Sequence, residues 1–576
     1  MTKKHTYGQI LKSSAVIGGS TLLNIAIGII RTKAMAMLLG PSGVGLMGLY
    51  ASITELTINI AGMGINSSGV RQIAEAVGSG DTERIARTAT VLRRVSIFLG
   101  ILGAVLLAVF SGPVSTFTFG NDQHKFAVTL LSLVVFFSTV SAGQGALIQG
   151  MRRISDLAKM GILGTLFGTF ISIPMIYFFR EEGVAPALVL VAAMTILTSW
   201  WYSRKIPIFT PSITASQLGH EAAALLKLGF AFMASGLLMA GASYVVRIIV
   251  VRQVGYDAAG LYQSAWSLGG LYIGFILQAI GADFYPRLTA VANDNTDCNR
   301  MVNEQAYVSL LLAGPGVIAT LVFAPLVIAL FYTPQFQGAV EVLRWLCLGM
   351  ALRVISWPMG CIIAAKGAQN FFLFSEVAWT VVYLGLAWVC VGFFSLNGVG
   401  IAFFASYIFH VFMVYLIVRR LSGFRWSAAN IQLSFLFLAL IGVVFSSFYV
   451  LPPLLAMLVG ALAVLLSSVY SVQVLLNLVS LAEIPRPVLK LLQWFRLISS
   501  SSSEYDGLEP MGEMEADGTI VGNKPSACIK ALIVAFMLCL VFSMWIYRYQ
   551  GGYGWSAELG AFESKLETLL SIFLRK

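Results

Sequence analysis

The sequence predicts an all-α polytopic membrane protein built from two lobes of six helices each. Three observations indicate this fold class: an apolar composition, a regular succession of long apolar windows, and an internal duplication. Of the 576 residues, 58% are hydrophobic and 11% are charged, and the mean hydropathy is +0.84. Soluble domains usually carry about 25% charged residues, so a water-solvated globule is excluded.

The apolar windows are each long enough to cross the roughly 30 Å of hydrocarbon in a bilayer. Glycine, proline or charged residues separate them. The first window lacks a small-residue cleavage site, so it is expected to remain as a helix rather than to be removed as a signal peptide. Fourteen spans are predicted, with 529–547 as a fifteenth candidate: 10–37, 44–69, 91–112, 126–149, 157–178, 183–203, 225–250, 258–282, 303–324, 338–365, 371–394, 398–418, 431–450 and 453–476.

The basic residues lie mostly in alternate loops between these spans. One set of loops holds 21 Lys and Arg residues, whereas the opposite set holds little beyond Lys125, Arg180 and Arg252. Because cytoplasmic loops carry the excess of positive charge, the amino terminus is expected in the cytoplasm. The same bias accounts for most of the net charge of +11, so a nucleic-acid partner is not expected.

Two segments 215 positions apart read alike, and both follow basic residues. Gly40 to Gly45 has the same spacing as Gly255 to Gly260. This duplication predicts two parallel lobes related by an axis along the membrane normal. The expected parts are the N-lobe, an inter-lobe linker, the C-lobe, spans 13 and 14, an acidic and serine-rich flexible linker, and a tail with the fifteenth candidate and an amphipathic stripe: 1–205, 206–224, 225–420, 421–498, 499–528 and 529–576.

Seven basic side chains are candidate ligands for an anionic substrate in a cavity between the lobes. A cation at the centre of a span costs about 2.5–3.5 kcal/mol on insertion scales, and an arginine fork matches the oxygens of a phosphate. The alternative is that these side chains are anchors at span ends, above all Arg71 and Arg287. Glu341 and Arg344 are expected to pair on one helical face, which leaves Arg353 as the freer cation. The seven candidates are Arg31, Lys33, Arg71, Arg247, Arg252, Arg287 and Arg353.

Three carboxylates in or at the ends of spans are candidate sites for a coupling ion: Glu55, Asp283 and Glu376. An intramembrane carboxylate either pairs with a cation or takes up H⁺ or Na⁺. His410 is interpreted as a packing residue rather than as a proton relay. No cofactor or metal is expected, because the six cysteines form no CxxC pair and fall mostly within spans.

The motifs of several enzyme classes are absent from the sequence. There is no GxxxxGK[ST] phosphate loop, no HExxH zinc motif and no DxD pair of a metal-dependent sugar transferase. Energy for transport would therefore come from ion or substrate gradients, and the chain is not expected to be an enzyme.

Four short segments carry a family resemblance: GPSGVGL at 40–46, GMGI at 62–65, YPRL at 285–288 and AAKG at 364–367. They resemble segments of the Wzx-type O-antigen translocases and lipid III flippases, within the multidrug/oligosaccharidyl-lipid/polysaccharide exporter superfamily. The resemblance covers about residues 8–420. Members of the lipid III type end near span 12, so the rest of this chain has no recognised counterpart.

The resemblance implies a V-shaped, two-bundle exporter in the bacterial inner membrane. Such a protein flips an undecaprenyl-pyrophosphate-linked oligosaccharide, for example an O-antigen repeat unit, to the periplasmic leaflet by alternating access. The family's cation-lined cavity would involve Arg31 and Arg247, with Arg353 near a further basic position. The implied partners are the lipid-linked oligosaccharide, membrane lipids, and a polysaccharide polymerase or glycosyltransferases.

Three other functions stay open. A lipid II flippase for peptidoglycan precursors has the same number of spans. A drug/cation antiporter would need an acidic cavity, whereas this sequence offers more cations than carboxylates within its spans. An O-antigen polymerase would need a large periplasmic loop, and the external loops here are short.

Overall fold

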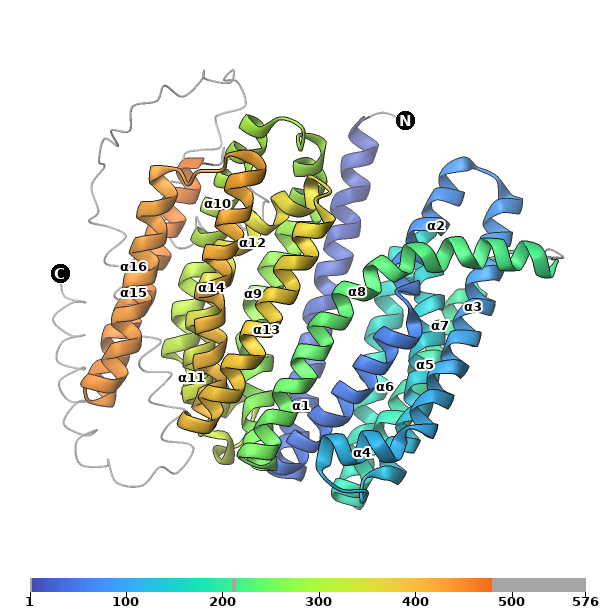
Figure 1. The fold of residues 1–576 in the computed structure, drawn as a ribbon, viewed down its shortest axis with the longest axis horizontal. Helices are drawn as coiled ribbons and strands as arrows, with labels where there is room; N and C mark the ends of the chain where they lie inside the picture. The colour runs from blue at the N-terminus through green and yellow to red at the C-terminus, as the bar shows by residue number, and fades with distance from the viewer. Residues whose placement is uncertain (1–2, 210–213, 479–576) are drawn as a thin grey trace, which may run out of the picture. The chain divides into compact units, whose positions relative to one another are not determined.

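The computed structural model describes residues 3–209 and 214–478, which form helices and short connections without a strand. The predicted flexible linker and the tail with the fifteenth candidate lie outside the described residues. Two short helices, α4 (Ser111–Phe119) and α11 (Ala324–Phe331), and two 3₁₀ turns, η1 (Arg180–Gly183) and η2 (Pro334–Phe336), accompany the long helices. The long helices, drawn in Figure 1, are α1 (Lys3–Gly62), α2 (Ile65–Ser79), α3 (Thr82–Val109), α5 (Lys125–Gly150), α6 (Ile154–Phe179), α7 (Val184–Arg204), α8 (Ala215–Gln253), α9 (Tyr256–Ala290), α10 (Asn295–Val322), α12 (Ala339–Ala365), α13 (Gln369–Phe394), α14 (Asn397–Ser422), α15 (Ala428–Val450) and α16 (Pro453–Leu478).

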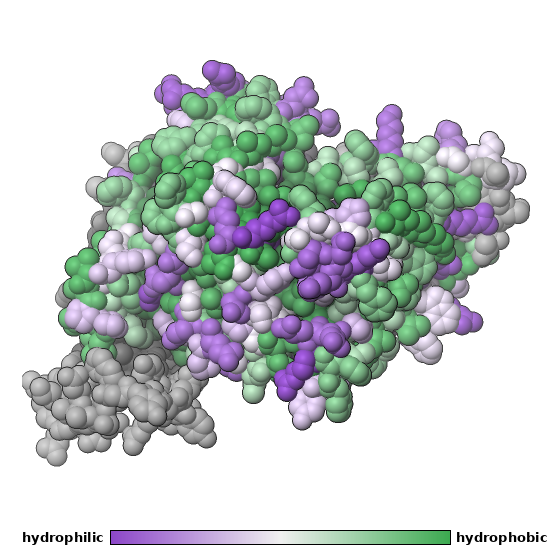
Figure 2. Space-filling view, turned by 60° about the horizontal axis from the view of Figure 1, so that its bottom comes forward, coloured by the Kyte–Doolittle hydropathy of each residue, from purple (hydrophilic) through white to green (hydrophobic). Residues whose placement is uncertain are grey.

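Eleven stretches of the described residues are long and apolar enough to cross a membrane. One of them, Leu23–Gly62, overlaps the predicted spans 10–37 and 44–69, and another, Ile154–Arg204, contains 157–178 and 183–203. The predicted span at 258–282 lies within α9. Figure 2 shows apolar flanks and a gathering of hydrophilic side chains over the end of the bundle that comes forward in that view. The predicted all-α polytopic class is confirmed.

Local sequence signals set several of the helix boundaries. Asp81 and Asp294 cap α3 and α10 by accepting hydrogen bonds from backbone N–H groups of the first turn, which otherwise lack partners. Thr214 and Gln217 form a capping box at the start of α8. The helix α8 therefore begins inside the segment predicted as the inter-lobe linker, 206–224.

The two halves of the chain share helix lengths and terminal conformations at a nearly constant offset. The helices α3 and α10 both have 28 residues and begin 213 positions apart, and α6 and α13 both have 26 residues and begin 215 positions apart. The residue that follows α6, Arg180 (φ 51°, ψ −130°), and the residue that follows α13, Ser395 (φ 53°, ψ −139°), have similar backbone conformations. The similarity of the two glycine segments thus extends to the backbone, while the symmetry axis stays a prediction.

Each half has its own apolar core. Leu92 and Leu147 lie at the centre of the first core, and Ile362 and Val418 lie at the centre of the second. Two long helices contact both halves, since α1 packs against α6 and α9, and α8 packs against α2 and α13. The chain from Pro452 onward, which includes α16, is a separate unit.

Candidate functional site

The duplicated glycine segments contact each other where α1 packs against α9. A Cβ atom at Gly45 would lie 2.8 Å from the backbone nitrogen of Gly260, and a Cβ atom at Gly260 would overlap the carbonyl oxygen of Pro41. Only glycine permits two backbones to approach in this way. Five residues earlier in each segment, the chain turns at a glycine with positive φ, 66° at Gly40 and 117° at Gly255. This end of the bundle, which also carries α4 and α11 (Figure 1), is the outer end in the predicted topology.

Two of the candidate cations link the halves at the outer end. Lys33 of α1 donates hydrogen bonds to the carbonyl oxygens of Ala329, at 2.6 Å, and Tyr332, at the C-terminal end of α11. Arg252, in the last turn of α8, donates to the carbonyl oxygen of Phe117 in α4. The last carbonyl groups of a helix lack partners within the helix and carry partial negative charge. Each half therefore supplies a cation that caps a short helix of the other half.

Two further polar contacts involve residues of α1. The hydroxyl group of Tyr50 lies 2.9 Å from Nδ1 of His124, and the hydroxyl group of Ser42 donates to Oε1 of Glu181 at 3.2 Å. Burial lowers the pKa of His124, although Glu181 acts in the opposite direction. Burial therefore favours the neutral form of His124, and its ring is a hydrogen-bond partner for Tyr50.

Arg247 is a buried cation that has hydrogen-bond partners but no carboxylate partner in the described part of the chain. Its side chain is 7% exposed. Both Nε and Nη2 donate to Oε1 of Gln263, at 3.0 and 2.8 Å, and Nη1 donates to the hydroxyl group of Ser243. Gln263 in turn faces Gly48 of α1, where a Cβ atom would lie 3.0 Å from the amide oxygen. These neutral partners orient the guanidinium group and leave its positive charge uncompensated.

Arg31 is placed against a different helix. A Cβ atom at Gly168 of α6 would lie 3.7 Å from Nη1 of Arg31. Arg31 is only partly exposed, and among the described residues it has no hydrogen-bond or ion-pair partner. The structure thus places Arg31 beside α6 and Arg247 beside α9. Within the described residues neither has a carboxylate counter-charge, and the two are in different halves.

Arg353 lies in a polar and aromatic cluster within the second half. It interacts electrostatically with Glu376 of α13 and with Tyr407 and His410 of α14. The Trp379 ring stacks on Tyr383 at 5.4 Å between centroids and lies 6.3 Å from the His410 ring. Within the described residues, Nε1 of Trp379 and Nδ1 of His410 are buried without a hydrogen-bond partner.

The predicted pairing of Glu341 with Arg344 is confirmed. Nη1 of Arg344 lies 2.6 Å from Oε1 of Glu341, and the guanidinium carbon lies 3.7 Å from the centroid of the Phe448 ring. The hydroxyl group of Tyr449 donates to the second oxygen of Glu341 at 2.8 Å. Arg353 is therefore free of Glu341, as the spacing predicted.

Three of the other predicted site residues are exposed in the structure. Arg71 is exposed and pairs with Glu75 at 2.8 Å, and Arg287 is exposed in the last turn of α9. Glu55 is exposed on α1. Asp283 falls within α9, but its side chain lies outside the described part of the structure.

Gln263, which holds Arg247, is not among the site residues predicted from the sequence. The signal was present, since Gln263 is an amide inside an apolar span and lies three residues after Gly260. Its role depends on the packing of α8 against α9 and α1, which no local pattern reveals.

Comparisons with known proteins agree with this architecture. Residues 34–341, more than half of the chain, match the family model described as "Polysaccharide biosynthesis protein". The lipid III flippase of Escherichia coli (strain K12) is 22% identical over 416 residues, which cover 71% of this chain and 99% of that protein. An uncharacterized membrane protein in the cps region of Klebsiella pneumoniae is 20% identical over 362 residues, which cover 62% of this chain and 72% of that protein.

Solved structures show the same fold. The lipid II flippase MurJ in its inward closed conformation superposes with a TM-score of 0.60 at 14% identity, covering 80% of this chain and 99% of that one. The inward-facing conformation of a multidrug resistance MATE family transporter of the MOP superfamily gives a TM-score of 0.56 at 18% identity, covering 70% and 96%. This chain is therefore a member of the polysaccharide biosynthesis protein family with the fold of MOP-superfamily transporters.

Proposed function

We propose that this protein is a flippase that moves a lipid-linked oligosaccharide from the cytoplasmic to the periplasmic leaflet. The substrate we infer is an undecaprenyl-pyrophosphate-linked repeat unit of O-antigen or a related polysaccharide. The observation that supports the proposal is the positive charge of Arg247, which is buried in an apolar bundle and, among the described residues, is held by neutral groups alone. A buried cation without a counter-charge is costly, and a pyrophosphate supplies the missing negative charge.

The whole-length similarity to the lipid III flippase of Escherichia coli supports the same substrate class. That protein's name identifies it as a flippase for lipid III, and 99% of it aligns with this chain. Arg31 adds a second cation that has no carboxylate partner in the described part of the chain. A cation exporter would need the opposite charge in its interior, so the drug antiporter alternative is disfavoured.

The contacts at the outer end fit a cycle of alternating access. In this structure the Gly45–Gly260 contact and the helix caps of Lys33 and Arg252 hold the two halves together at that end. Opening toward the periplasm requires these contacts to break, and substrate or ion binding must favour the open state by differential affinity. We infer that Glu376, beside Arg353, takes up the coupling H⁺ or Na⁺.

Reconstituted flipping tests the proposal. Proteoliposomes receive a lipid-linked O-antigen repeat unit with a label on its sugar, and a membrane-impermeant reagent reports the label on the outer surface. We expect translocation that depends on the protein and exceeds the rate in protein-free liposomes. A parallel assay with lipid II separates the two flippase functions, since faster flipping of lipid II would favour the peptidoglycan alternative. Equal rates with and without protein, for both substrates, would reject flippase activity.

A further inference from the structure

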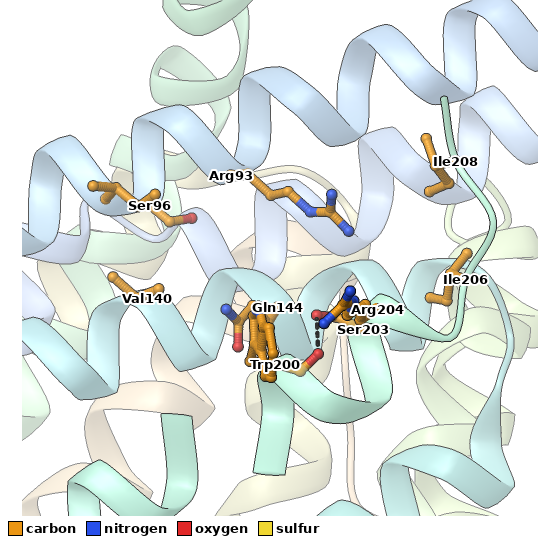
Figure 3. Close-up of a pocket in the computed structure, with 10 residues that line it drawn as sticks. Arg93, Ser96, Val140, Gln144, Trp200, Ser203, Arg204, Ile206 and Ile208 are labelled. Atoms are coloured by element: carbon orange, nitrogen blue, oxygen red, sulfur yellow. Dashed lines mark hydrogen bonds between the residues drawn. The ribbon is translucent and has the colours of Figure 1, made fainter. Parts of the chain in front are cut away.

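A pocket of about 430 Å³ lies in the first half, away from all the predicted site residues. The helices α3, α5 and α7 and the linker after α7 surround it (Figure 3). Its polar lining is formed by Arg93, Ser96, Gln144, Trp200, Ser203 and Arg204. In the predicted topology this end of the first half faces the cytoplasm, and the pocket volume is in the range of small-molecule sites.

Two arginines reach the pocket without a counter-ion. Figure 3 shows Arg93 extending from α3 and Arg204 from α7 into the same space. No Asp or Glu is among the lining residues, and neither guanidinium group has a hydrogen-bond or ion-pair partner in the described residues. Two like charges that share a pocket repel each other, so an anion between them would be stabilised by both.

Two nearby arginines, Arg87 and Arg153, differ from this pair because each has a carboxylate partner. Arg87 pairs with Glu83 at 2.9 Å, and Arg153 pairs with Asp156 at 2.7 Å. Nor does the fold itself require a cation at position 93. At the 213-residue offset between α3 and α10, the counterpart of Arg93 is Ala306, which is buried in the second half.

The remaining polar groups add a hydrogen-bond donor to the pocket. The hydroxyl group of Ser199 donates to Oε1 of Gln144, which leaves the Nε2 amide group of Gln144 available to an acceptor. The hydroxyl groups of Ser96 and Ser203 donate to backbone carbonyls of their own helices. The available donors are therefore two guanidinium groups and an amide, a set suited to phosphate oxygens.

The aromatic residues beside the pocket place it at the depth of lipid head groups. Trp200 and Trp201 are exposed. The Arg204 guanidinium carbon lies 5.3 Å from the Trp200 ring centroid, and Nζ of Lys205 lies 5.6 Å from that of Trp201. Tryptophan and cationic residues gather at the membrane–water interface in this way. Apolar side chains, including Ile97 and Val140, line the same pocket and suit the glycerol and upper acyl carbons of a lipid.

We propose that this pocket binds the phosphate head group of an anionic lipid of the cytoplasmic leaflet. The phosphate lies between Arg93 and Arg204, Gln144 donates to one of its oxygens, and the lipid tail follows the apolar lining toward the bilayer. The proposal does not depend on the transport substrate, because none of these residues belongs to the cationic groups assigned to translocation.

Native mass spectrometry of the purified full-length protein tests this site. The protein is titrated with phosphatidylglycerol and, separately, with zwitterionic phosphatidylcholine. We expect preferential retention of phosphatidylglycerol, reduced at least about tenfold in Arg93→Gln/Arg204→Gln, since charge-assisted hydrogen bonds to phosphate are lost. Arg94→Gln is the matched control, because Arg94 is the exposed neighbour of Arg93 and does not line the pocket.

Three outcomes would overturn the proposal. The first is equal retention of the two lipids by the unchanged protein. The second is retention of phosphatidylglycerol by the double variant at the level of Arg94→Gln. The third is displacement of the lipid by equimolar inorganic phosphate, which would show that the pocket binds a soluble phosphate instead of a lipid. Arg204→Gln alone replaces an exposed side chain, so its weaker retention supports the site even if the double variant fails to fold.

Discussion

Gly45 and Gly260 lie backbone against backbone, and neither position has room for a side chain. They occupy the same place in two similar segments, 215 positions apart. Each half therefore contacts the other through the backbone at the same glycine of the segment. Close approach through small residues is a common basis of helix association in membranes. This contact is also the point at which the halves must separate if the outer end opens.

Replacing either glycine by alanine should prevent this contact. A Cβ atom at Gly260 would overlap the carbonyl oxygen of Pro41, and overpacking of this kind costs about 1–3 kcal/mol. We expect Gly260→Ala and Gly45→Ala to lower the thermal unfolding temperature in detergent. Gly385→Ala is the control, because a Cβ atom there meets no atom within 4 Å, and it should leave the unfolding temperature unchanged. Equal unfolding temperatures of all three variants would show that the contact contributes little to stability.

Removing the two helix caps should open the outer end. In a cysteine-free background, Ala259→Cys places a thiol beside Gly45, at a position that is 2% exposed. Hydrogen bonds to a charged group contribute about 1.5–3 kcal/mol, so Lys33→Met/Arg252→Gln should speed labelling of this thiol by an impermeant maleimide about tenfold or more. Lys125→Met removes an exposed lysine of α5 and should have no effect. An unchanged labelling rate in the double variant would show that the two caps do not keep the outer end closed.

Gln263 offers a test of the uncompensated charge itself. Gln263→Glu keeps the shape of the side chain but adds an anion at the oxygen that now lies 2.8 and 3.0 Å from the Arg247 nitrogens. We expect this variant to fold normally and to lose at least about tenfold in flipping rate, because a paired Arg247 no longer attracts a pyrophosphate. A folded Gln263→Glu variant that flips at the normal rate would show that the free charge is not needed.

Much of the helix pattern and part of the site could be predicted from the sequence. Apolar windows, caps and glycine breaks are local signals, and the pairing of Glu341 with Arg344 follows from helical spacing. The partner of Lys33 was not predictable, because its hydrogen bond to Ala329 joins residues 296 positions apart. Such contacts depend on how the helices pack against one another. That packing is determined by side-chain shape, and the local periodicity of the sequence does not reveal it.

Glu376 should determine the ion dependence of transport. It is partly buried beside Arg353, whereas Glu55 is exposed on α1. We expect Glu376→Gln to abolish the acceleration of flipping by an imposed proton or sodium gradient, because the variant cannot exchange a charge. Glu55→Gln, as the exposed comparison, should keep that acceleration. Loss of gradient dependence in Glu55→Gln alone would assign coupling to Glu55 instead.

The flipping rate of Arg31→Gln/Arg247→Gln tests the central claim most directly. Each of the two substitutions keeps a polar side chain but removes a positive charge. Arg94→Gln controls for the loss of an exposed arginine. The rate of the double variant with a pyrophosphate-linked oligosaccharide should fall by at least about tenfold, whereas its unfolding temperature should be retained and Arg94→Gln should transport normally. A folded double variant that flips its substrate at the unchanged rate would contradict a cationic interior as the basis of transport.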